Sequence, residues 1–339
     1  MKDAGCRLYL HYRHMAFMGF AAVLHHWRDV RRNFRIAKEA LLAEKPDVLI
    51  LIDYPSFNLR MAAFCRKHLP ETKIYYYIPP KVWAWKRRRI HAIARLCDEV
   101  LGIFPFEPSF YARYGYRCTY VGNPTVEEVA EGSNSNNPNN PNSPNSPNNS
   151  GTPGIVLLPG SRESEVRHCL PRMLEAARRF PEYGITVCAA PGMEDTFYSP
   201  YLREGETLTR DTYAAVAGAA AAVVNSGTAT LEAALLRCPQ VAVYHLACSG
   251  LLRYTRWLLQ PMLFSIRWFT PVNIVAGREL IKECIANDFT VEKVAAELER
   301  LLTDEGYKKE MLAGYGHLSE LLGSQSASET AAALVTSTP

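Results

Sequence analysis

The chain has 339 residues, 48% hydrophobic and 21% charged, a composition typical of a soluble protein large enough for two cores. The net charge of +4 is too small for a dedicated nucleic-acid binder, and no apolar stretch is long enough to span a bilayer. The nine scattered cysteines include no CxxC pair, which argues against disulfides or structural zinc and favours a reducing cytoplasm.

Short apolar runs alternate with helical patterns in the first part of the chain. Strands are predicted at 48–52, 74–78 and 100–104, and residues 27–43 have a helical pattern. The runs are continuously apolar, which is typical of strands covered on both faces of a parallel sheet. The intervening helices favour a doubly wound α/β fold.

Asp53 is a candidate general base because it directly follows the first buried run. Pro55 restricts the backbone beside it, so the carboxylate is expected to project from the strand end. There it would take a proton from an acceptor hydroxyl. An ordinary helix cap is the alternative interpretation, and Asn58 is likewise a cap or a ligand.

Trp83 and Trp85 precede the basic cluster 86–89. Indoles beside cations suit a lipid–water boundary or an anionic head group, which favours substrate binding and peripheral membrane contact. The same pattern also fits tryptophans in the core beside a solvated helix start.

The tract 132–153 consists mainly of Asn, Pro and Ser and has no apolar residue, so we expect a disordered linker. Residues 1–131 and 154–339 then form two Rossmann-like domains, and the last helices of the second would return to the first. In the second domain the strands are predicted at 155–158, 185–190, 221–224 and 241–244. Ligands of such sheets bind beyond the carboxyl ends of the strands.

Two strand-to-helix turns of the second domain carry candidate ligands for a diphosphate. Ser161 and Arg162 follow the first strand, and the guanidinium is placed to pair with phosphate oxygens through two bonds. The run 225–232, NSGTATLE, would leave the backbone N–H groups of its turn at the positive end of a helix dipole. Its diphosphate ligands are Ser226, Gly227 and Thr228, and Glu232 lies about one helical turn later, within reach of a ribose.

A third turn, 270–280, adds Asn273 and Arg278 in a polar and basic loop that is expected to lead into a helix. Each turn alone also fits an ordinary helix cap or an exposed polar loop. Three such loops in one half of the chain favour a site for a nucleotide sugar.

The motifs together resemble the lipid-A-disaccharide synthase family of glycosyltransferases, which has the two-domain GT-B fold. The resemblance rests on HYRHMAFMGF, DVLILIDYPSFN, YYIPPKVWAWK, FPFE, YVGNP, LLPGSRESEV, NSGTATLE and NIVAGREL, in the family's order. It covers nearly the whole chain apart from the Asn/Pro/Ser tract.

The resemblance implies a hexosyltransferase of lipid A and lipopolysaccharide biosynthesis. An inverting transfer would join a UDP-diacylglucosamine donor to an acylated glucosamine 1-phosphate acceptor. The first domain would be the acceptor side and the second would bind the UDP-sugar. No cofactor and no metal are expected. The enzyme would work on the cytoplasmic face of the inner membrane, and a homodimer is among the expected partners.

The roles implied by the resemblance fall on residues already singled out. Asp53 is similar to the general base; Arg162, Ser226, Thr228 and Glu232 resemble UDP-contacting positions; Asn273 and Arg278 lie in the matched loop near the donor. Trp83, Trp85 and the neighbouring arginines would hold the acyl chains and the acceptor phosphate.

Family members begin with a strand and a glycine-rich loop that precede the first matched segment of this chain. We therefore expect the first half, as written, to fold poorly. Two alternatives remain from other classes: a non-catalytic UDP-sugar-binding remnant, and another GT-B enzyme such as a UDP-N-acetylglucosamine epimerase or a cell-wall glycosyltransferase.

Overall fold

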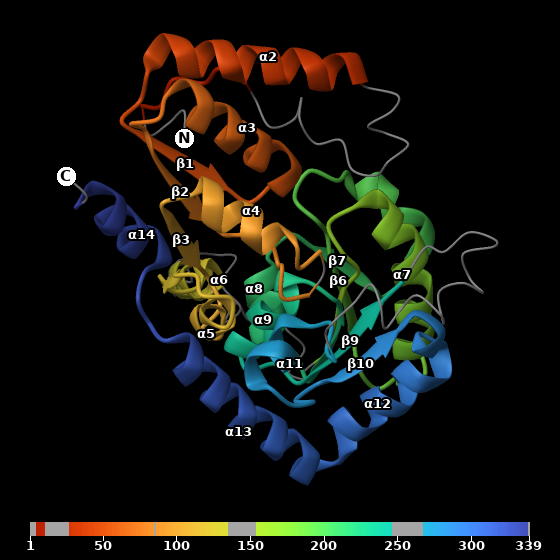
Figure 1. Cartoon of the computed structure of the whole chain (residues 1–339). Helices are drawn as coiled ribbons and strands as arrows, with labels where there is room; N and C mark the ends of the chain where they lie inside the picture. Colours follow the sequence, from red (N-terminus) through yellow and green to blue (C-terminus); the bar gives the residue numbers. More distant parts are fainter. Residues whose placement is uncertain (1–4, 11–26, 85, 135–153, 246–266, 338–339) are drawn as a thin grey trace. The chain divides into compact units, whose positions relative to one another are not determined.

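The computed structural model describes residues 5–10, 27–84, 86–134, 154–245 and 267–337. The chain divides into two compact units, one comprising Met1–Val121 with Ser328–Pro339 and the other Gly122–Ala327. Each unit contains a parallel β-sheet with packed helices (Figure 1). The predicted α/β class with parallel sheets is confirmed.

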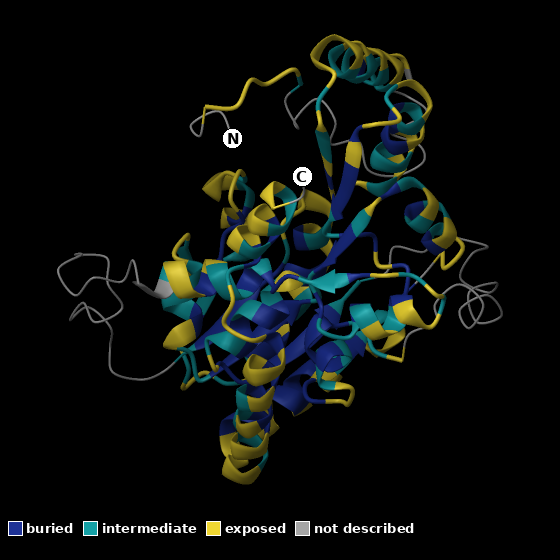
Figure 2. Cartoon of the chain, turned by 60° about the vertical axis from the view of Figure 1, so that its left-hand side comes forward, coloured by how far each residue is buried: buried dark blue, intermediate teal, exposed yellow. Residues whose placement is uncertain are grey.

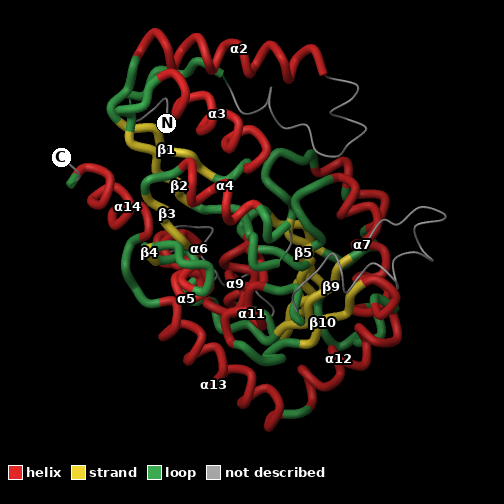
Figure 3. Tube along the Cα trace, viewed as in Figure 1, coloured by secondary structure: helices red, strands yellow, loops and turns green. Residues whose placement is uncertain are grey.

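The first unit is built on a four-stranded parallel sheet in the order β1-β2-β3-β4. Strands and helices alternate along the chain, as the yellow and red segments of Figure 3 show, because a parallel pair needs a crossover connection. The strands are β1 (Val48–Ile52), β2 (Lys73–Tyr77), β3 (Glu99–Gly102) and β4 (Thr119–Tyr120). The helices are α2 (Trp27–Glu44), α3 (Pro55–His68), α4 (Arg89–Leu96), α5 (Glu107–Ala112) and α14 (Ala327–Thr336).

Both faces of this sheet carry a hydrophobic core. On one face, Leu51 and Tyr76 pack with Ile90 of α4. On the other face, Leu101 packs with Ala331, so α14 from the end of the chain contributes to the first unit. Most residues of β2 and β3 are buried, whereas β1 and β4 are largely partly exposed; Figure 2 colours the chain by burial.

Strand β1 departs from the prediction of a fully buried strand. It forms the edge of the described sheet, and Ile50 and Ile52 are each 46% exposed. Leu51, which points to the opposite face, is buried. The prediction is therefore wrong for one face of β1, where no described helix packs over these two side chains. That the first half folds poorly stays a prediction.

The second unit contains a six-stranded parallel sheet in the order β10-β9-β8-β5-β6-β7. The strands are β5 (Ile155–Leu158), β6 (Ile185–Cys188), β7 (Thr207–Thr209), β8 (Ala221–Asn225), β9 (Gln240–Tyr244) and β10 (Lys282–Ile285). The α-helices are α6 (Pro124–Asn134), α7 (Glu163–Ala177), α8 (Thr212–Ala217), α9 (Thr228–Leu235), α11 (Pro271–Ala276), α12 (Val291–Thr303) and α13 (Glu305–Leu322). Short 3-10 turns occupy Asp195–Phe197, Ser199–Tyr201 and Ala286–Asp288.

The central strands of this sheet are buried on both faces, as their apolar sequences predict. Every residue of β5 and β8 is buried. On one face Val156 and Val224 pack with Val216 of α8 and Ala233 of α9. Helices α7 and α12 contact each other and strands of the sheet.

The predicted and observed elements differ mainly at the sheet edges and at the linker. Strands β4, β7 and β10 were not predicted, because they are short, partly polar edge strands without an apolar run. Helix α6 continues to Asn134, past the predicted linker start at 132, and residues 135–153 lie outside the described residues. The domain boundary at 131 stays a prediction. In the structure, α6 is grouped with the second unit.

Candidate functional site

The sheet of the second unit has a topological switch point between β5 and β8. These strands pair in parallel, from Ile155↔Ala221 to Leu158↔Val224. From this pair the chain proceeds outward to β6 and β7 on one side and to β9 and β10 on the other. The loops at the carboxyl ends of β5 and β8 therefore diverge, which creates a ligand crevice in an open α/β sheet.

A pocket of about 680 Å³ occupies this crevice, within the range of roughly 300–1,000 Å³ usual for ligand sites. It brings together six residues predicted from the sequence: Ser161, Arg162, Ser226, Gly227, Thr228 and Glu232. They come from the two loops of the switch point and the first turns of α9. Further polar lining residues, which the sequence analysis did not single out, are Glu165, Arg210, Asp211, Tyr213, Asn225 and Tyr244.

Gly160 allows the two loops to approach each other closely. Its φ of +116° lies in a region that other residues rarely adopt. A β-carbon here would lie 2.6 Å from Glu165 Oε2 and 2.7 Å from Asn225 Nδ2. Glycine is thus required both by the backbone conformation and by contacts with α7 and β8.

Glu165 organises the first loop. Its Oε2 accepts hydrogen bonds from the backbone N–H groups of Ser161 at 3.1 Å and Arg162 at 3.3 Å. Its Oε1 accepts a bond of 2.7 Å from Arg162 Nη1. The guanidinium therefore stays at the pocket wall, where a phosphate group would compete with Glu165 for it.

The second loop leaves the start of α9 open toward the pocket. Ser226 N–H donates to Val243 O at 2.7 Å, which continues the sheet pairing past β8. The hydroxyl of Thr230 donates to Gly227 O at 2.8 Å. The first amides of the helix, at Thr228 and Ala229, have no preceding helical carbonyl to bond. The pocket thus offers backbone donors and the positive end of a helix dipole to an anion.

Glu232 adds a carboxylate to the pocket on the second turn of α9. Burial is the main cause that raises its pKa, and the nearby negative charge of Glu128 raises it further. A hydrogen bond with the Thr228 side chain acts in the opposite direction. A half-buried carboxylate in this position can accept hydrogen bonds from a diol such as a ribose.

Of the lining residues that were missed, Glu165 and Asn225 lie inside the quoted motifs, whereas Arg210, Asp211, Tyr213 and Tyr244 lie outside them. Arg210 and Asp211 follow the polar strand β7, and Asn225 ends β8. Arg210 Nη2 donates to Asp195 Oδ1 at 2.5 Å and to Met193 O at 2.7 Å. This segment reaches the crevice only because of the order of the strands in the sheet. The local sequence does not predict that order.

Asn273 is fully buried and does not line the pocket at the switch point. Its Oδ1 accepts from the backbone N–H groups of Leu280 at 2.7 Å and Ile281 at 2.9 Å. Its Nδ2 donates to Ile281 O and Glu283 Oε1, both at 2.9 Å. Here Asn273 fastens α11 to the start of β10, and its role at the donor stays a prediction.

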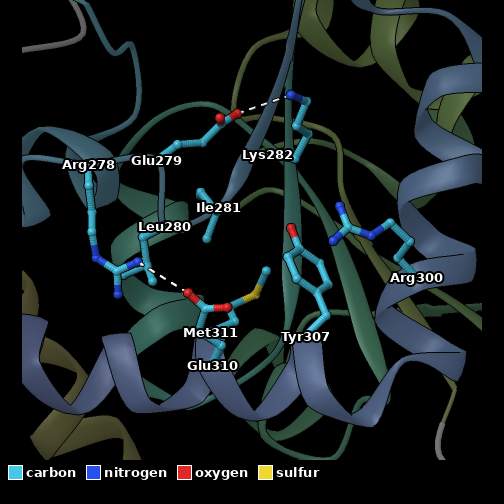
Figure 4. A pocket seen from close by; sticks show the side chains of 9 residues that line it. All are labelled: Arg278, Glu279, Leu280, Ile281, Lys282, Arg300, Tyr307, Glu310 and Met311. Atoms are coloured by element: carbon cyan, nitrogen blue, oxygen red, sulfur yellow. Dashed lines mark hydrogen bonds and ion pairs between the residues drawn. The ribbon is translucent and has the colours of Figure 1, made fainter.

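Arg278 lies in a separate pocket of about 170 Å³, which Figure 4 shows. Its Nη1 is 3.8 Å from Glu310 Oε1 on α13. The predicted order of loop and helix is wrong in this region, because helix α11 comes first and the loop with Arg278 leads into strand β10. The sequence pattern predicts a helix after this loop, whereas the helix precedes it.

Asp53 of the first unit is exposed at the carboxyl end of β1 with a rigidly held backbone. It has a φ of +43° and Tyr54 a φ of +39°, both strained for residues with side chains. The Asp53 carbonyl accepts hydrogen bonds from Asn58 Nδ2 at 2.6 Å and from the Tyr76 hydroxyl at 2.9 Å. These bonds fix the direction in which the aspartate leaves the strand.

Trp83 is packed inside the first unit, with 6% of its surface exposed. Its Nε1 donates to the buried Glu107 Oε1 at 3.1 Å, and its ring meets those of Phe104 and Phe106 edge-on. This placement gives Trp83 a packing role, and its contact with substrate stays a prediction. Trp85 lies outside the described residues.

No group of His, Cys, Asp or Glu in the described part of the chain has an arrangement suited to a metal ion. No helix among the described residues combines the length and apolar character needed to cross a membrane.

Comparison with known proteins identifies similar sequences over nearly the whole chain. The family model described as lipid-A-disaccharide synthetase matches residues 1–335. The lipid-A-disaccharide synthase of Geobacter sulfurreducens is 33% identical, with 99% of this chain and 86% of that protein covered. The enzyme of the same name from Myxococcus xanthus is 35% identical, with 97% and 85% covered.

Solved structures show the same fold at low sequence identity. The UDP-GlcNAc 2-epimerase of Neisseria meningitidis, bound to UDP-GlcNAc, has a TM-score of 0.64 at 10% identity, with 91% of this chain and 81% of that one covered. A calicheamicin glycosyltransferase has a TM-score of 0.56 at 15% identity, covering 100% and 88%. The predicted GT-B fold is thereby confirmed.

Replacing Asn273 with alanine should destabilise the second unit. The change leaves the buried amides of Leu280 and Ile281 without acceptors, so we expect the free energy of unfolding to fall by about 2–4 kcal/mol. Urea denaturation measures this loss. The matched control is Asn287→Ala at an exposed position, with a change within about 0.5 kcal/mol. Unchanged stability together with weaker UDP binding in the Asn273→Ala variant would instead assign Asn273 to the ligand.

Proposed function

The chain belongs to the lipid-A-disaccharide synthetase family and is a GT-B glycosyltransferase of lipid A biosynthesis; we propose that it joins UDP-2,3-diacylglucosamine to 2,3-diacylglucosamine 1-phosphate. The products are lipid A disaccharide 1-phosphate and UDP. The family resemblance predicted from the sequence is confirmed, whereas the acylated substrates and the residue roles are proposals.

The observation that carries the donor assignment is the pocket at the β5–β8 switch point. It combines a guanidinium at Arg162, the open amides of α9 and the carboxylate of Glu232 within one cavity. A nucleoside diphosphate needs each of these groups. The diphosphate would contact Arg162 and the amides at Thr228 and Ala229, and Glu232 would accept hydrogen bonds from the ribose hydroxyls.

The reaction is an inverting displacement at the anomeric carbon of the donor. The acceptor hydroxyl loses its proton to the Asp53 carboxylate as its oxygen forms the new glycosidic bond. The bond between the anomeric carbon and the UDP oxygen breaks, and its electron pair leaves with the diphosphate. Arg162 and the α9 amides stabilise the negative charge that grows there.

The geometry around Asp53 supports its role as the base. A helix-capping aspartate would accept a backbone hydrogen bond through its side chain, but α3 has Tyr54 at its N-cap position and no side-chain cap bond. The carboxylate remains exposed, while its own carbonyl is held by two side chains. Strain retained beside an exposed carboxylate is typical of a functional position.

Peripheral contact with the cytoplasmic face of the inner membrane is a further part of the proposal. A groove of about 420 Å³ runs along α2, lined by the cations Arg31, Arg35 and Lys38, by the apolar Phe34, Leu42 and Phe64, and by one carboxylate, Glu39, which lies 3.9 Å from Arg35. Cations around an apolar floor suit anionic lipid head groups. That the chain forms a homodimer stays a prediction, which sedimentation equilibrium would test by measuring the molecular mass in solution.

An assay with both acylated substrates tests the reaction. The full chain should release UDP and form a tetra-acyl disaccharide, and Asp53→Asn should lower kcat about 10²- to 10⁴-fold because the general base is lost. The control is Asp47→Asn, an exposed aspartate just before the opposite end of β1, which should keep full activity. Disaccharide formed by Asp53→Asn at the wild-type rate would remove the base assignment, and no product from the wild type would contradict the function.

The pH dependence of UDP binding tests Glu232. Its ionised form accepts the ribose hydrogen bonds best, so affinity should fall as the pH drops through its raised pKa. Glu128→Gln removes a like charge and lowers that pKa, so UDP binding should persist to lower pH than in the wild type. Calorimetric titration of both proteins measures the shift, and phosphate protonation of UDP cancels in the comparison. Glu131→Gln on the same helix is the control; equal midpoints in wild type and Glu128→Gln would contradict the assignment.

Vesicle sedimentation tests the membrane contact. With anionic phosphatidylglycerol vesicles, the double change Arg35→Gln and Lys38→Gln should weaken binding about 30-fold. Each removed cation is expected to lose about 1 kcal/mol of binding free energy. The control pair, Lys308→Gln and Lys309→Gln on α13, should bind like the wild type. Equal binding of the wild type to anionic and to neutral phosphatidylcholine vesicles would argue against the α2 groove.

A further inference from the structure

Two cations of the first unit lie near the candidate base. Lys81 follows β2, and Arg89 is the first residue of α4. The Asp53 carboxylate interacts electrostatically with Lys81, and both Asp53 and Arg89 interact with the Tyr76 ring hydroxyl. That hydroxyl bonds to the Asp53 carbonyl, and Arg89 Nη2 lies 3.5 Å from the hydroxyl of Ser56, which is three residues after Asp53. Lys81 follows β2, the neighbour of β1 in the sheet.

Neither cation has a carboxylate within ion-pair distance among the residues that the structure describes. Lys81 is exposed, and its nearest ring contact places Nζ 5.9 Å from the Phe104 centroid. Arg89 is half-buried, and its Nη2 lies 3.5 Å from the exposed Ser56 hydroxyl. Desolvation of the ammonium group lowers the pKa of Lys81, although the residue as a whole is exposed, and the charges of Glu107 and Asp53 oppose this lowering.

Glu107 forms no ion pair with Lys81 in the described part of the chain, and its oxygens accept hydrogen bonds from other groups. Oε2 accepts from the backbone N–H groups of Ile103 at 2.8 Å and Phe104 at 3.0 Å. Oε1 accepts from Trp83 Nε1 at 3.1 Å, and only 1% of the residue is exposed. The ammonium group therefore remains available to an anion that arrives from solution.

We propose that Lys81 and Arg89 bind the phosphate monoester of the acceptor beside Asp53. This inference rests on the proposed function and names the subsite that distinguishes a sugar 1-phosphate from a neutral sugar. The ligands proposed for the donor diphosphate lie in the second unit.

The chemistry of the three side chains suits a phosphate dianion. Lys81 supplies a compact point charge, the Arg89 guanidinium supplies a fork of donors, and the Ser56 hydroxyl supplies one more. The backbone around them is constrained, since Lys81 follows Pro79 and Pro80, and Asn58 and Tyr76 fix Asp53. Phosphate bound by these groups would hold the acceptor hydroxyl at a set position relative to the base.

Kinetics with two acceptors test the subsite in the full chain. Diacylglucosamine 1-phosphate and diacylglucosamine without the phosphate are each supplied with the same donor. The wild type should prefer the phosphorylated acceptor in kcat/KM, and Lys81→Met and Arg89→Met should each reduce this preference about 10- to 100-fold. The loss should arise from a higher KM for the phosphorylated acceptor, with unchanged UDP affinity. Lys81→Arg should retain part of the preference.

Lys67→Met, an exposed lysine in the last turn of α3, is the matched control and should keep the wild-type preference. Circular dichroism confirms that each variant is folded. An unchanged preference in both Lys81→Met and Arg89→Met overturns the subsite.

Failure of the subsite can be distinguished from failure of the proposed function. If the wild type forms no disaccharide, the function is wrong, and the subsite is judged by equilibrium binding of diacylglucosamine 1-phosphate in detergent. Binding that weakens at least 10-fold in Lys81→Met then supports the phosphate contact. Equal affinities of the wild type and Lys81→Met overturn it.

Discussion

The pocket at the β5–β8 switch point, which we propose as the donor cradle, depends on the absence of a β-carbon at Gly160. The Glu165 carboxylate from α7 and the Asn225 amide from β8 both occupy the space that a side chain would need. Any larger residue would push these elements apart, and it would also be strained at a φ of +116°. The glycine thus sets the spacing between the two loops whose polar groups face the pocket. Gly160 therefore determines both how close the two loops lie and which polar groups face the pocket.

The cradle is not simply a positive site. Glu165 holds the Arg162 guanidinium, and Glu232 carries a second carboxylate whose ionisation is opposed by burial. A diphosphate must therefore gain more from the guanidinium than Glu165 does, and the backbone amides of α9 supply the remaining attraction without a counter-ion. Such a site favours a ligand that has an anion to meet the amides and a diol to meet Glu232. A free phosphate satisfies only the first requirement.

Sequence patterns predicted the elements that depend on continuous burial and missed those that depend on topology. The apolar runs of β5 and β8 were located because a buried strand needs them, and the edge strands β4, β7 and β10 were missed because polar residues are tolerated there. Ser161, Arg162 and Glu232 were found because each lies in a turn with a recognisable pattern. Arg210 and Asp211 reach the same pocket only through the strand order, and Trp83 and Asn273 have packing partners that no local pattern reveals.

Both units carry charged side chains beyond the carboxyl ends of their parallel strands, but they hold these side chains in different ways. In each, reactive groups follow the carboxyl ends of parallel strands, where the backbone leaves the sheet and side chains become accessible. In the second unit the proposed ligands of the anion are the α9 amides and the Arg162 guanidinium, which Glu165 holds. In the first, no carboxylate among the described residues lies within ion-pair distance of Lys81 or Arg89, whereas Asp53 is held through its carbonyl and its side chain is exposed. A base must stay free to take a proton, so its position has to be fixed by bonds that leave the carboxylate untouched. The hydrogen bonds from Asn58 and Tyr76 meet that requirement.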